Sequence, residues 1–107
     1  MTKSIQAISF VFLPGRGADK AILDTCTGWV RHIGRFGESR TYTFFLDDHL
    51  LRGSAEVLLL DGKKQPLLKL NRQSPAGRVD LNRKNRYFLR WEWKGATGRC
   101  ALHWERK

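Results

Sequence analysis

Apolar residues recur along this chain at alternate positions or in short blocks separated by Gly, Pro, Asn and Asp. Alternation of this kind is typical of β-strands that bury one face, whereas a helix repeats its apolar positions every three to four residues. It is clearest at the start, in Phe10 and Phe12, and in the segments at 40–46 and 86–93. The pattern predicts about seven or eight short strands and a single helical turn near residues 18–23.

Many short strands separated by turns favour an all-β fold, and we expect an antiparallel β-sandwich of the jelly-roll or immunoglobulin-like kind. A small β-barrel is the alternative. A length of 107 residues fits one domain spanning residues 1–107, which is enough to bury a single core.

The chain contains no apolar run long enough to predict a transmembrane segment. An apolar stretch near the N-terminus is interrupted by Gln6 and Ser9, and no small-residue cleavage site of a signal peptide follows it. We therefore expect a cytoplasmic protein, exported only if a signal peptide precedes this sequence.

The last twenty residues are predicted to form a hairpin around a four-residue loop at 95–98. In that register Trp93 faces Cys100 and Trp91 faces Leu102, so the facing pairs on one side are all apolar. A domain of this size has to bury its largest apolar side chains. We therefore expect the tryptophans in the core and the charged residues between them on the outer face.

Cys26 and Cys100 are the two cysteines of the chain. Without a secretory signal we expect free, buried thiols, and a disulfide only if the chain is exported. Because the sequence has neither a Cys/His cluster nor a phosphate-loop motif, we predict no metal and no cofactor.

Positive charge is concentrated in the second half of the chain, and the net charge is +10. Residues 1–53 contain seven Lys and Arg against five acids, whereas residues 54–107 contain thirteen against five. A basic surface of this kind attracts phosphates and carboxylates. We predict a binding face on the charged side of the last hairpin and the turn before it, formed by Arg83, Lys84, Arg86, Phe88, Arg90, Lys94, Arg99 and His103.

The sequence thus predicts a small basic binding domain without catalytic residues, which holds an anionic macromolecule, either nucleic acid or an acidic protein. It has no aromatic motif for reading RNA bases and no helix for the major groove, so contacts to nucleic acid would be made to the backbone with little sequence specificity. A basic face that only faces solvent would have the same composition.

Three other functions stay open. The first is a structural or assembly component that binds an acidic protein, and the second is a carbohydrate-binding sandwich. The third is a small basic nuclease in which His103, beside Arg90 and Glu92, would supply acid–base chemistry.

Overall fold

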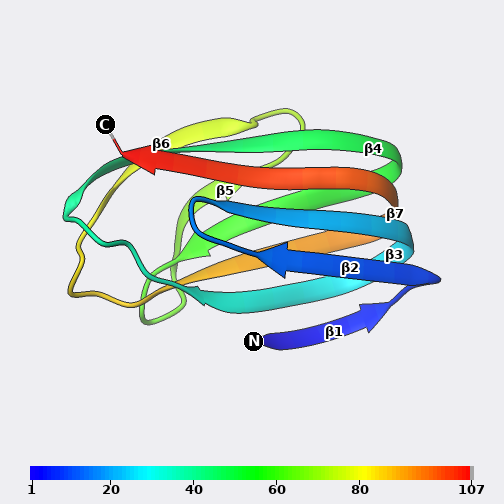
Figure 1. Cartoon of the computed structure of the whole chain (residues 1–107), viewed down its shortest axis with the longest axis horizontal. Helices are drawn as coiled ribbons and strands as arrows, with labels where there is room; N and C mark the ends of the chain where they lie inside the picture. The colour runs from blue at the N-terminus through cyan, green and yellow to red at the C-terminus, as the bar shows by residue number, and fades with distance from the viewer. Residues whose placement is uncertain (107) are drawn as a thin grey trace.

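The computed structural model describes residues 1–106, whose regular elements are all β-strands. Seven strands form one antiparallel sheet in the order β1-β3-β7-β4-β5, with β2 also paired to β3 and β6 to β4 (Figure 1). The strands are β1 (Thr2–Gln6), β2 (Ser9–Pro14), β3 (Ala18–Gly34), β4 (Arg40–Leu60), β5 (Pro66–Leu70), β6 (Ala76–Leu81) and β7 (Tyr87–Arg106).

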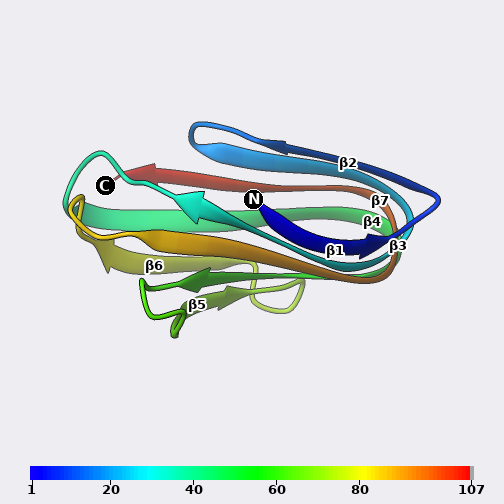
Figure 2. The same ribbon diagram turned by 90° about the horizontal axis from the view of Figure 1, so that it is seen from below.

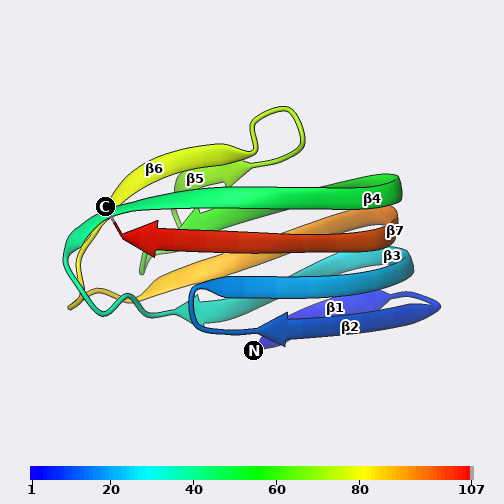
Figure 3. The ribbon, with the colours of Figure 1, turned by 45° about the horizontal axis from the view of Figure 1, so that its top comes forward.

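The sheet is folded over on itself because β3, β4 and β7 each bend near the middle. Figure 2 shows the two resulting layers edge-on, and Figure 3 shows the strands of the first layer side by side. The first layer contains β2, β6 and residues 18–24, 40–50 and 98–106; the second contains β1, β5 and residues 27–34, 54–60 and 87–94. The prediction of an all-β, antiparallel sandwich is confirmed, although both layers belong to one sheet.

The three bends lie together at one end of the molecule, which we call the closed end, and the opposite end, with most of the loops, is the open end (Figure 1). Glycines permit the bends. Gly98 has a φ of +132°, and a Cβ on it would lie 2.7 Å from the carbonyl oxygen of His49. The pairing of β4 with β7 shifts register at the same place, between Leu50 and Ser54, as expected for bulges that bend a strand.

The predicted C-terminal hairpin is wrong, because residues 95–98 are a bend inside the single strand β7. Each half of β7 pairs with β3 on one side and with β4 on the other, rather than with its own other half. The prediction of a tryptophan core is nevertheless confirmed: Trp91 and Trp93 are fully buried and stacked 5.4 Å apart, and Trp104 packs partly buried against the core. These rings fill the space between the layers.

The predicted helical turn at residues 18–23 is also wrong, because this segment lies in β3 between β2 and β7. Asp19, Ala21 and Leu23 point into the core, whereas Lys20 and Ile22 face solvent. A strand forms here rather than a helical turn because β2 on one side and β7 on the other supply backbone hydrogen-bond partners.

Asp19 is a charged residue that is fully buried. Its Oδ2 atom accepts hydrogen bonds from His32 Nε2 at 2.7 Å and from Trp91 Nε1 at 3.1 Å. Asp19 belongs to the first layer and both donors to the second, so this network connects the two layers toward the open end.

Candidate anion-binding surface

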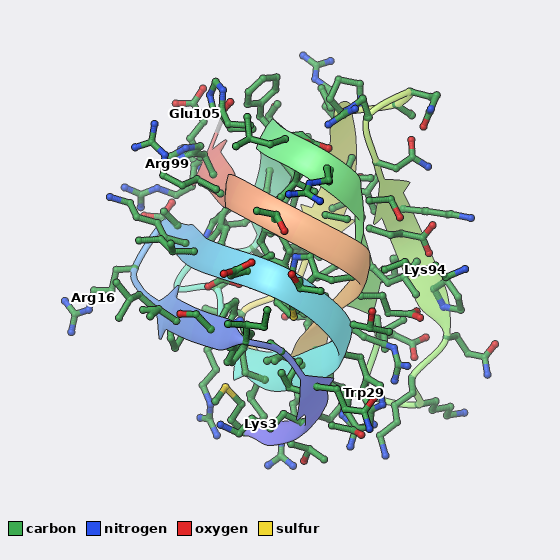
Figure 4. The ribbon with its side chains drawn as sticks, turned by 90° about the vertical axis from the view of Figure 1, so that its right-hand side faces the viewer. Lys3, Arg16, Trp29, Lys94, Arg99 and Glu105 are labelled. Carbon is green, nitrogen blue, oxygen red and sulfur yellow. The ribbon has the colours of Figure 1, made fainter. Side chains whose placement is uncertain are left out.

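The structure divides the eight predicted binding residues among three places. Since β7 changes layers at its bend, Arg99 and His103 lie on the outer face of the first layer, and Arg90 and Lys94 on the outer face of the second. Figure 4 shows Lys94 and Arg99 on opposite sides of the molecule. The structure therefore does not bring all eight residues to one face.

Arg90 already has partners in the folded chain. Its Nε lies 3.4 Å from a carboxylate oxygen of Glu92, and its guanidinium stacks 4.5 Å from the ring centroid of Trp29. Lys94 lies next to the bend of β7, at the closed end. Arg90 is the cross-strand partner of Arg31, whereas Lys94 lies at the end of the molecule opposite the turn that carries Arg83 and Lys84.

The grouping that the nuclease alternative requires is not formed. His103 is the cross-strand neighbour of Ala18 and Phe45 in the first layer. Arg90 and Glu92 lie in the second layer, on its outer face. The predicted hairpin would bring these three side chains together, but the bend of β7 places them in different layers.

The other four predicted residues lie together at the open end, where the turn between β6 and β7 leads into the first residues of β7. The turn between β4 and β5 packs against them, because Lys64 Nζ lies 5.7 Å from the ring centroid of Phe88. Arg31 of β3 approaches the same ring, at 5.4 Å. We call this group the Phe88 cluster, and its members are Arg31, Lys63, Lys64, Arg83, Lys84, Arg86 and Phe88.

The cations of the Phe88 cluster are not neutralised by the chain itself. The ion pairs formed within residues 1–106 leave all six without a carboxylate partner. Asp61 is the acid of the β4–β5 turn, and its Oδ1 accepts hydrogen bonds from the backbone N–H groups of Lys63 and Gln65, at 2.9 Å each. This acid therefore shapes the turn rather than pairing with a cation.

Hydrogen bonds also fix the shape of the β6–β7 turn. The backbone N–H of Asn82 donates to the hydroxyl of the buried Tyr87 at 2.9 Å, and Asn82 Oδ1 accepts from the N–H of Lys84 at 2.9 Å. The N–H of Asn85 donates to the carbonyl of Asn82 at 3.0 Å. Because the turn is ordered, its basic side chains start from a defined backbone position, which lowers the entropic cost of binding.

Sequence reasoning missed the contribution of Arg31, Lys63 and Lys64. Arg31 lies far from Phe88 along the chain, and only the pairing of β3 with β7 brings it close. The sequence carries one signal, since the alternation in residues 28–34 places Arg31 on an outer face beside Trp29 and Ile33. It does not indicate which strand lies next to that face.

The sequence matches no protein-family model, and no curated protein matches it. None of residues 1–106 lies in a helix long and apolar enough to cross a membrane. Over the same residues, no three His, Cys, Asp or Glu side chains are grouped so that they could hold a metal ion.

Proposed function

We propose that this protein is a non-enzymatic binding domain that holds an anionic macromolecule through the Phe88 cluster. One observation carries the proposal: Arg31 and Lys64 approach the ring of Phe88 from two other segments, four more cations lie in the adjoining turns, and no acid of the described chain neutralises the six. Unpaired cations repel one another, so an arrangement of this kind is stabilised by an added anion.

Nucleic acid is the partner that this arrangement fits best, through its phosphates. The ring of Phe88 is partly buried and carries Arg31 and Lys64 within cation–π distance, so it positions cations rather than stacking on a base. Phosphate contacts position a protein on nucleic acid but carry no sequence information. We therefore expect weak sequence specificity and a strong dependence of affinity on salt.

The test is fluorescence anisotropy of labelled single-stranded RNA and DNA of generic sequence, titrated with the protein at several salt concentrations from about 50 to 200 mM. The variant carries Arg83→Gln, Lys84→Gln and Arg86→Gln, and the matched control carries Lys20→Gln, Arg52→Gln and Arg78→Gln. All six of these side chains are exposed, and those of the control lie outside the cluster.

The expected result is loss of affinity in the cluster variant, together with a shallower slope of log K against log salt by about 0.7 per lost contact with a single strand. The control variant should bind like the parent. The proposal is wrong if the parent does not bind at about 50 mM salt, or if both variants lose affinity equally. Binding to polyglutamate but not to nucleic acid would instead assign the cluster to an acidic protein.

A further inference from the structure

A cleft of about 1050 Å³ opens between the two layers at the open end of the sandwich. Four segments form its walls: the turn between β2 and β3, the end of β3 with the loop after it, Tyr42 near the start of β4, and the end of β7. Their residues include no member of the Phe88 cluster. A cleft of this size is at the upper end of the range for small-molecule sites, about 300–1000 Å³.

The polar side chains at the cleft are mainly cationic: Arg16, Arg35 and Arg106 line it, together with the acid Glu105. Arg106 is paired with Glu38. The ion pairs formed within the described chain do not involve Arg16 or Arg35. Two guanidinium groups, which come from opposite layers, are therefore available to an anion that enters the cleft.

His32 also lines the cleft, and its ring orientation is fixed. Its Nε2 is hydrogen-bonded to the buried carboxylate of Asp19 at 2.7 Å, and this holds the ring in place. Its Nδ1 lies 3.3 Å from the carbonyl oxygen of Ile33, which is long for a hydrogen bond. The side chain is 13% exposed and lines the cleft. Because Nε2 carries the proton donated to Asp19, Nδ1 of the neutral ring can accept a hydrogen bond from a ligand hydroxyl.

Aromatic side chains form another wall of the cleft that contains Arg16 and Arg35. Phe36 folds from the loop after β3 into the end of the sandwich, where its ring lies 5.1 Å from that of Tyr42 and 6.1 Å from that of Trp104. All three line the cleft, and Trp104 is the one that remains partly exposed. The wall therefore offers an apolar surface to a flat ring, while the arginines attract an anion.

We propose that this cleft binds a nucleoside monophosphate, with the phosphate between Arg16 and Arg35 and the base against Trp104. A bare phosphate would leave most of the cleft and its aromatic wall unused. A phosphate ester that carries a planar base matches both the charged and the aromatic parts. The site does not depend on the Phe88 cluster, which shares none of the residues that line it.

The test is a ¹H–¹⁵N NMR titration of the whole chain with adenosine monophosphate, adenosine and inorganic phosphate as separate probes. Adenosine monophosphate should shift the indole resonance of Trp104, and each of the other two probes should bind at least about tenfold more weakly. The double variant Arg16→Gln, Arg35→Gln should weaken binding of the nucleotide by about tenfold or more, because it removes two charge-assisted contacts. The variant Arg52→Gln, at the closed end, is the matched control and should bind like the parent.

The inference is overturned if adenosine monophosphate leaves Trp104 unshifted at millimolar concentration, or if the double variant binds it as tightly as the parent. Comparing a 5′-phosphorylated dinucleotide with free nucleotide shows whether the phosphate comes from a chain end or from a small molecule. The variant with Arg83, Lys84 and Arg86 replaced by Gln should still bind the nucleotide. Its behaviour separates failure of this inference from failure of the proposed function.

Discussion

Asp19 places a carboxylate between two apolar layers, where water does not reach it. A buried charge lowers stability strongly unless it is paired and hydrogen-bonded. Here His32 and Trp91 supply the donors, and both belong to the opposite layer. The cost of burying Asp19 is therefore offset only when the layers are stacked so that His32 and Trp91 reach its carboxylate. Asp19 thus favours this one arrangement of the two layers.

Replacing Asp19 by Asn tests this role at constant volume. The amide oxygen can still accept both hydrogen bonds, but without the charge they are weaker, and the buried amide nitrogen would take the place of Oδ1, which has no partner. We therefore expect the free energy of unfolding to fall by about 1–3 kcal/mol in urea denaturation. The control Asp24→Asn, at a half-buried position in the same strand, should change it by less than about 0.5 kcal/mol. Equal effects of the two substitutions would contradict the argument.

The two thiols are both buried and free, as the sequence predicted. Burial raises the pKa of Cys26, and it raises that of Cys100 to about 12 from an ordinary value of 9.0. The reactive thiolate is therefore scarce in the folded protein near neutral pH. Both thiols should resist a disulfide reagent at about pH 8 and react at once in guanidinium. Fast reaction without denaturant would show that the sandwich opens locally.

The raised pKa of Cys100 also makes stability depend on pH. Its folded value lies above its unfolded value, so its contribution is fully present below pH 9.0 and is lost as the pH rises toward about 12. The variant Cys100→Ala should lose less stability than the parent over that interval, measured by denaturation at each pH. Identical pH dependence in the two proteins would be evidence against this contribution.

At the scale of elements, the bends of the three long strands decide the architecture. Gly98 combines a φ of +132° with close contact to the backbone of β4. A Cβ there would strain the main chain and press against the carbonyl of His49, so we expect Gly98→Ala to destabilise the fold by about 2–4 kcal/mol. Gly37→Ala is the control, since a Cβ on Gly37 would meet nothing within 4 Å. Similar melting temperatures for both variants would show that the bend tolerates a side chain.

The sequence was sufficient to predict the strands and much of the core, because alternation is a local property. It could not distinguish a hairpin from a bend at residues 95–98, since both keep Trp91 and Trp93 on the same side as Leu102. The distinction depends on whether β7 pairs with itself or with β3 and β4, and those partners are remote in the chain. Local sequence cannot supply that information.

In the candidate site, too, only the contacts between residues close in the sequence could be predicted. The adjacency of Arg83, Lys84 and Arg86 is written in the sequence, and the structure keeps them in one turn. Arg31 joins them only through the register between β3 and β7. The cleft was not predicted at all, because its walls come from four separate segments that the folded sheet brings together.

At the scale of the whole molecule, β7 has an unusual place. It is the central strand of both layers, with β3 on one side and β4 on the other over most of its length. Without it, β3 and β4 lose their common neighbour, and the core loses its two buried tryptophans. We therefore expect a fragment of residues 1–86 to be unfolded, as judged by the dispersion of its NMR spectrum. A peptide of residues 87–107 should restore the native spectrum, and a folded fragment would refute this reading.

The same placement has a consequence for biosynthesis. Chains grow from the N-terminus, so β7 is the last of the seven strands to leave the ribosome. Until then the earlier strands lack the neighbour that would cover their backbone hydrogen-bonding groups, and such open edges invite pairing with other chains. The domain therefore cannot complete its fold before β7 has emerged, and the stage before that is when it most needs protection from aggregation.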